Sequence, residues 1–113
     1  MKIVKEKILL SDLKKIAKRS FGNLVKAVVD IEKKIMVVDA DLHADQESLL
    51  LKNGSQQDNL WGINLFPQAK GEDLIEFDSM INLRPSQNNL TRGVDDLQIR
   101  KKIIKIVNQL IKK

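Results

Sequence analysis

Residues 24–38 read LVKAVVDIEKKIMVV, and this stretch predicts two β-strands joined by a short polar turn. Successive side chains of a strand point to opposite faces, so residues two apart share a face. The charged segment at 32–34 can reverse the chain, and 35–43 then returns as the second strand. The apolar face of the first strand consists of every second residue: Val25, Ala27, Val29 and Ile31.

The pattern continues on both sides of this hairpin. Further strands are predicted at residues 2–9, 60–66 and 74–84, where apolar residues recur or alternate with polar ones. A helix over about 12–21 has Ser11 in front of it as a cap, and Asp95 with Gln98 three residues on is typical of the start of a C-terminal helix. Apolar residues recur along that last helix: Leu97, Ile103, Ile104, Val107, Leu110 and Ile111.

Residues 44–53 fit two structures. Asp45 and its neighbours can open a helix that ends at Gly54, or 47–52 is a strand. The strand is favoured, because Asn53-Gly54 followed by a polar loop is typical of a β-hairpin.

These elements predict an α+β fold. The arrangement is a two-layer sandwich, with a mostly antiparallel sheet of about five to six strands and the N-terminal and C-terminal helices on one face. A chain of 113 residues has the size of one domain, so a single domain is expected over 1–113.

The composition excludes several classes of protein. The chain has no cysteine, which rules out disulfides and thiolate metal sites. No apolar run approaches the about 20 residues that cross a bilayer, so no membrane association is expected. The first residues lack the apolar stretch of a secretory signal, and we expect a cytoplasmic location.

The net charge of +5 is unevenly distributed. Residues 1–34 carry 10 basic and 4 acidic side chains, 35–79 carry 2 and 9, and 80–113 carry 8 and 2. Basic ends are typical of nucleic-acid contact or, as we favour, of helices with solvated lysine faces. The four aromatic residues show no exposed spacing for stacking bases, which weakens the nucleic-acid interpretation.

Polar side chains alternate with apolar ones along two predicted strands. Carboxylates and a neutral imidazole are ligands for divalent cations, and close carboxylates favour acid–base chemistry. His43, the only histidine, and Asp41 are the candidate catalytic residues. A solvated strand face explains the same pattern without a site. The candidate metal ligands are Asp39, Asp41, His43, Asp45, Glu76 and Asp78.

A second polar cluster occupies residues 82–93. Arginine binds carboxylate or phosphate through two parallel hydrogen bonds, and this loop leads into a helix N-terminus that attracts anions. Alternatively, the loop is held by its own side chains, with Arg84 paired to Asp39, Asp41 or Asp78. Gly62, in the middle of a strand, indicates a bulge or a close approach of another segment. The candidate anion-binding residues are Arg84, Arg92, Asn82, Gln87 and Asn64.

Four words of the sequence carry a resemblance to a known family. They are His43-Ala44-Asp45, Asn53-Gly54-Ser55, LWGINLFP at 60–67 and INLRPSQ at 81–87. In this order they resemble a small prokaryotic domain-of-unknown-function family over nearly the whole chain. The resemblance implies a complete, stand-alone domain and no particular activity, substrate or cofactor.

Two functional hypotheses follow. In the first, the polar sheet face binds a divalent cation and hydrolyses a phosphoester-like substrate. In the second, the chain is a homo-oligomeric or partner-binding module without catalysis, and its acidic sheet face meets a basic helical surface on another chain.

The cation hypothesis predicts a thermal shift. A ligand at about 100 times its Kd stabilises a protein by about 2.7 kcal/mol, which for a domain of this size is on the order of ten degrees in Tm. Unfolding with Mn²⁺, Mg²⁺ or Zn²⁺ against EDTA measures it. One metal should raise Tm, and Asp41→Ala should remove that rise without unfolding the chain. An equal rise in both proteins would contradict the assignment of Asp41.

Overall fold

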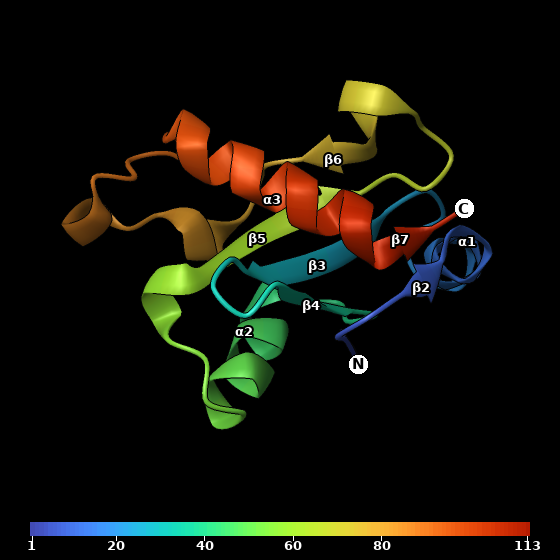
Figure 1. The fold of residues 1–113 in the computed structure, drawn as a ribbon, viewed down its shortest axis with the longest axis horizontal. Helices are drawn as coiled ribbons and strands as arrows, with labels where there is room; N and C mark the ends of the chain where they lie inside the picture. Colours follow the sequence, from blue (N-terminus) through green and yellow to red (C-terminus); the bar gives the residue numbers. More distant parts are fainter.

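Five strands form one antiparallel sheet in the computed structural model, which describes all of residues 1–113 (Figure 1). Every pairing in this sheet is antiparallel. A separate parallel pair joins two short strands from the two ends of the chain, β2 (Ile8–Leu9) and β7 (Ile111–Lys112). Across the main sheet the order is β1 (Lys2–Val4), β4 (Ile35–Val38), β3 (Val25–Asp30), β5 (Leu60–Leu65) and β6 (Ile75–Glu76).

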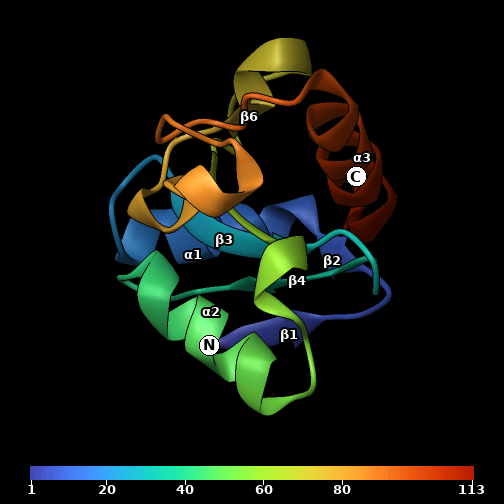
Figure 2. The same ribbon diagram turned by 90° about the vertical axis from the view of Figure 1, so that its left-hand side faces the viewer.

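Two helices cover one face of the sheet, as predicted. They are α1 (Leu10–Arg19) and α3 (Leu97–Leu110), and their buried residues belong to the main core. The predicted α+β class is confirmed. A third helix, α2 (His43–Lys52), packs on the opposite face and adds a partial third layer (Figures 1 and 2). No helix has the length and apolar character that crossing a bilayer requires.

The central strands β3 and β5 are buried on both faces. Toward α1 and α3, β3 contributes Val25, Ala27 and Val29 from the predicted apolar face, and β5 contributes Trp61, Ile63 and Leu65. Toward α2, Val28 and Leu60 pack with Leu50 in a smaller cluster. This double burial explains why the two strands read as nearly continuous apolar runs.

The favoured prediction of a strand at 47–52 is wrong, because these residues lie in α2. The helix buries His43, Gln46 and Leu50, which are spaced as one face of a helix. Two of the three are polar, so the apolar pattern from which helices are recognised is nearly absent. After α2, the Ser55 hydroxyl donates a hydrogen bond of 2.7 Å to the buried carboxylate of Asp30 and holds this part of the chain against β3.

Two predicted strands are shorter than expected. The strand at 35–43 ends at Val38, because Asp39 adopts a left-handed backbone conformation with φ 67° that turns the chain toward α2. The strand at 74–84 pairs with the main sheet only through β6. It then gives way to a short 3₁₀ helix, η3 (Met80–Asn82), whose first turn is capped by the Ser79 hydroxyl.

The first predicted strand and the starts of two helices also differ from prediction. The predicted strand at 2–9 is divided into β1 and β2. Helix α1 starts one residue before Ser11, so Ser11 does not cap it. Asp96, not Asp95, caps α3 by accepting a hydrogen bond from the Gln98 amide. Three further 3₁₀ turns lie in the loops: η1 (Gln57–Asn59), η2 (Gly71–Leu74) and η4 (Pro85–Gln87).

The packing of α2 can be tested with two neighbouring leucines. Leu50 is fully buried under the sheet, whereas Leu51 is 41% exposed. Leu50→Ala should lower the free energy of unfolding by about 2–5 kcal/mol, since it leaves a cavity. Leu51→Ala should change it by less than about 0.5 kcal/mol. Urea titration measures both values. A strand at 47–52 would place Leu49 and Leu51 together on one face, and equal losses at 50 and 51 would contradict the helix.

Candidate functional site

The acidic residues of the first predicted cluster do not share a strand face. Asp39 lies at the end of β4 and forms an ion pair of 2.5 Å with Arg19 of α1. Asp41 is exposed in the turn before α2, and Asp45 is exposed in the first turn of that helix. The turn at 39–42 therefore separates carboxylates that a longer strand would have aligned.

His43 is the one member of this cluster that is buried. It begins α2, and its Nε2 lies 2.7 Å from the carbonyl oxygen of Ile63. Because a carbonyl only accepts, Nε2 holds the proton, and Nδ1 has a free lone pair with no partner in the chain. Burial lowers the pKa of His43, and the nearby charges of Lys26 and Arg92 lower it further. The hydrogen bond to Ile63 and the charge of Asp78 oppose this shift.

A neutral imidazole with one free nitrogen is chemically competent to accept a proton or to ligate a metal ion. The neighbouring acids are engaged elsewhere, however. Glu76 accepts a hydrogen bond of 2.8 Å from the Asn64 amide, and Asp78 pairs with Arg92 at 2.6 Å. No three His, Asp or Glu side chains come together in a metal-binding arrangement. The cation hypothesis gains no support from this geometry and stays a prediction.

Arg84, the first predicted anion-binding residue, is buried and bonded within the chain. Its guanidinium lies 4.7 Å from the ring of Trp61 and donates to the carbonyls of Leu60 and Ile81 and to the side chain of Gln87. Burial lowers its pKa, while the carboxylate of Glu47, 3.6 Å away, opposes the shift. The loop is therefore held by its own side chains, as the alternative interpretation supposed, but with Glu47 as the acidic partner.

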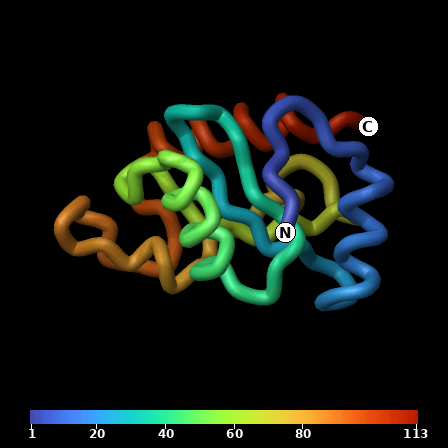
Figure 3. Tube along the Cα trace, turned by 90° about the horizontal axis from the view of Figure 1, so that it is seen from below, coloured from blue at the N-terminus to red at the C-terminus, as the bar shows by residue number.

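Asn82 completes the edge of β5 where β6 stops. Its side-chain oxygen accepts from the Gly62 amide at 2.8 Å, and its nitrogen donates to the Gly62 carbonyl at 2.9 Å. Gly62 allows this close approach, since a Cβ there would lie 2.5 Å from the Cβ of Ser79. The segment then projects at the end of the molecule opposite α1 (Figure 3), where Asn89 holds it through three donated hydrogen bonds.

The comparison with protein families matches nearly the whole chain. The words LWGINLFP and INLRPSQ contain the residues that hold β5 to the loop: Trp61, Gly62, Asn82, Arg84 and Gln87. A family model described as a protein of unknown function, DUF5674, matches residues 2–110. The chain belongs to the DUF5674 family. Neither a search of curated proteins nor a search of solved structures gave a match.

This DUF5674 protein also has a groove that the sequence did not reveal. It measures about 940 Å³ and opens between α1, α3 and the segment from Pro67 to Phe77. Its walls come from three separate parts of the chain, so no local motif marks it. Ile104 could have indicated the groove, because it belongs to the predicted apolar stripe of α3 and yet is 41% exposed. The apolar stripe of this helix therefore extends beyond the core.

The buried histidine of this DUF5674 protein predicts a pH dependence. The unfolded chain takes up a proton near pH 6.5, whereas folded His43 takes it up only at lower pH. The stability contributed by neutral His43 should therefore be complete above pH 6.5. It should be lost as pH falls toward the folded pKa, with a slope of at most about 1.4 kcal/mol per pH unit.

Urea unfolding from pH 8 to pH 5 tests this expectation. His43→Gln keeps an amide that can reach Ile63 but does not titrate. The free energy of unfolding should fall more steeply below pH 6.5 in the parent protein than in the variant. Parallel profiles would show that the folded histidine titrates normally.

Proposed function

We propose that this DUF5674 protein is a partner-binding module without catalysis, and that the side formed by α1 and α3 receives an acidic partner. The distribution of charge supports the proposal. Residues 97–113 carry six basic side chains and no acidic one. Helix α1 adds Lys14, Lys15, Lys18 and Arg19 against the single acid Asp12.

The lysines among these cations lack acidic partners within the chain, and this observation carries the proposal. The protein has three ion pairs, formed by Arg19, Arg84 and Arg92. None of the lysines of α1 or of residues 97–113 takes part in one. Unpaired cations on one side of a protein create a positive potential that steers and holds an acidic partner.

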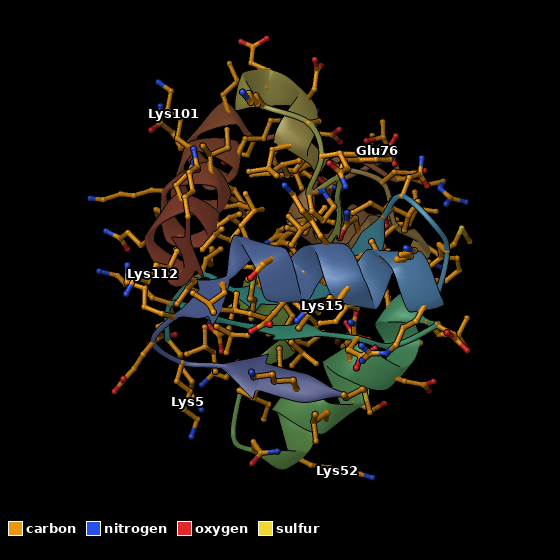
Figure 4. All side chains as sticks on the ribbon, turned by 90° about the vertical axis from the view of Figure 1, so that its right-hand side faces the viewer. Lys5, Lys15, Lys52, Glu76, Lys101 and Lys112 are labelled. Atoms are coloured by element: carbon orange, nitrogen blue, oxygen red, sulfur yellow. The ribbon has the colours of Figure 1, made fainter.

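The labelled side chains in Figure 4 show how far this basic side extends. Lys15 lies on α1, Lys101 on α3 and Lys112 on β7, whereas Lys5 and Lys52 lie lower in the same view, near β1 and at the end of α2. All five are exposed. Exposed lysines away from α1 and α3 thus provide a matched control for those on the basic side.

A second copy of the chain is one candidate partner. The exposed acids Asp41 and Asp45 lie next to the N-terminus of α2, on the opposite side of the sheet from α3 (Figure 2). Contact between this region and the helices of another copy would be head-to-tail. The mass in solution would then exceed one chain and fall with salt. A single-chain mass at every salt concentration would assign the basic side to a different protein.

Charge reversal tests the proposed surface. Lys15→Glu with Lys101→Glu changes the net charge by the same amount as Lys5→Glu with Lys52→Glu. Binding of a labelled polyglutamate peptide, measured by fluorescence anisotropy at low salt, should weaken about tenfold or more in the first pair. It should weaken less than about threefold in the control pair, because screening limits the effect of distant charges.

Equal weakening in both pairs would show that net charge, not the α1 and α3 side, governs binding. Duplex DNA provides a second comparison. If it bound more tightly than polyglutamate and responded to the same variants, the partner would be a nucleic acid, and the proposal of an acidic protein would fail.

A further inference from the structure

The groove between α1 and α3 lies within the basic side but has an apolar floor. Leu74 and Ile111 are buried at its base, and the volume of about 940 Å³ is at the upper end of the range for ligand sites. Burying apolar surface here would add a favourable term that charge alone does not provide. The apolar residues of the floor and walls are Leu10, Leu74, Ile75, Phe77, Ile104 and Ile111.

Cations stand on every side of this floor. Lys14 comes from α1, Lys70 from the loop before η2, Arg100 from α3 and Lys113 from the residue after β7, against the single acid Glu72. A second hollow of about 440 Å³ shares Lys14, Pro67 and Gln68 with the first and continues along α1 past Lys15 and Lys18. The groove is therefore elongated and basic along its length.

Arg100 is held in position for an acidic group. Its guanidinium lies 4.8 Å from the ring of Phe77, and its Nε donates to the carbonyl oxygen of Val94 at 2.5 Å. The two terminal nitrogens form no hydrogen bond within the chain. A guanidinium that is already oriented loses little conformational freedom when a carboxylate binds to it.

We propose that the groove binds an acidic amphipathic helix of a partner protein. This inference rests on the proposed function and names the class of partner for the same basic side. The apolar face of such a helix would place side chains at positions i, i+3 or i+4, and i+7 on the floor. Its flanking carboxylates would meet the lysines on either side and Arg100.

Two other occupants fit less well. A small amphipathic acid has its charge at one end, so it would leave the cations on the other sides without a partner. A polyanion without apolar groups would leave the floor exposed to water. Only a ligand with apolar groups in the middle and acids along both sides matches the whole groove.

The test uses three labelled peptides of about 16 residues, long enough for the four turns of helix that would span such a groove. The first has leucines on one helical face and glutamates beside them. The second is a scrambled sequence of the same composition, and the third is polyglutamate. Fluorescence anisotropy should show the amphipathic peptide binding about tenfold more tightly than either of the others.

Two variants of α3 locate the site. Ile104→Gln places a polar group in the groove, while Leu97→Gln changes a 67% exposed residue of the same helix outside it. Both positions are exposed, so neither change should unfold the chain. Ile104→Gln should weaken binding of the amphipathic peptide about fivefold or more and leave polyglutamate unaffected, and Leu97→Gln should change neither.

The outcomes separate this inference from the proposed function. Equal affinities for the amphipathic and scrambled peptides, with Lys15→Glu and Lys101→Glu still weakening both, would overturn the groove and leave the basic surface standing. Loss of any dependence on those lysines would overturn both proposals. If dodecanoate displaced the amphipathic peptide at equal concentration and Ile104→Gln abolished that displacement, the occupant would be a small amphipathic acid, and the helix proposal would be wrong.

Discussion

The backbone of β5 must find hydrogen-bond partners along an edge that its neighbouring strand only partly covers. β6 pairs with Asn64 and Leu65 alone, and buried backbone groups without partners are costly. The Asn82 side chain supplies both partners for Gly62, and Arg84 supplies one for Leu60. The loop after β6 is thus attached to the sheet by side chains in place of a strand, and α3 starts from the end of that loop.

The sheet could be predicted because its signals are local and periodic. Alternation in the first predicted strand placed Val25, Ala27 and Val29 together on the face that α1 and α3 cover. Helix α2 escaped prediction because His43 and Gln46 occupy two of its three buried positions. His43 bonds to the backbone of β5, and Gln46 bonds to the backbone of β3. No local sequence pattern identifies a buried polar residue whose hydrogen-bond partner is a carbonyl far away in the chain.

For the candidate site, the sequence pattern grouped residues that the structure separates. Alternation predicted that Asp39, Asp41 and His43 share one face of a strand. The left-handed backbone conformation of Asp39 ends that strand, so the three side chains do not share a face. Arg84 and Asn82 have the chemistry of a binding site, yet their hydrogen bonds serve the fold. Composition did identify the basic ends, because charge summed over 17 residues at 97–113 does not depend on where each side chain points.

The parallel pairing of β2 with β7 has a kinetic consequence. It joins Ile8 to Ile111, so the two sides of the groove come from segments about a hundred residues apart in the chain. Closing so long a loop is entropically costly and delays the contacts that depend on it. We therefore expect the groove to form after the local hairpin of β3 and β4. A partly folded chain would have a sheet but not the complete groove, so the docking that we propose would be restricted to chains that have finished folding.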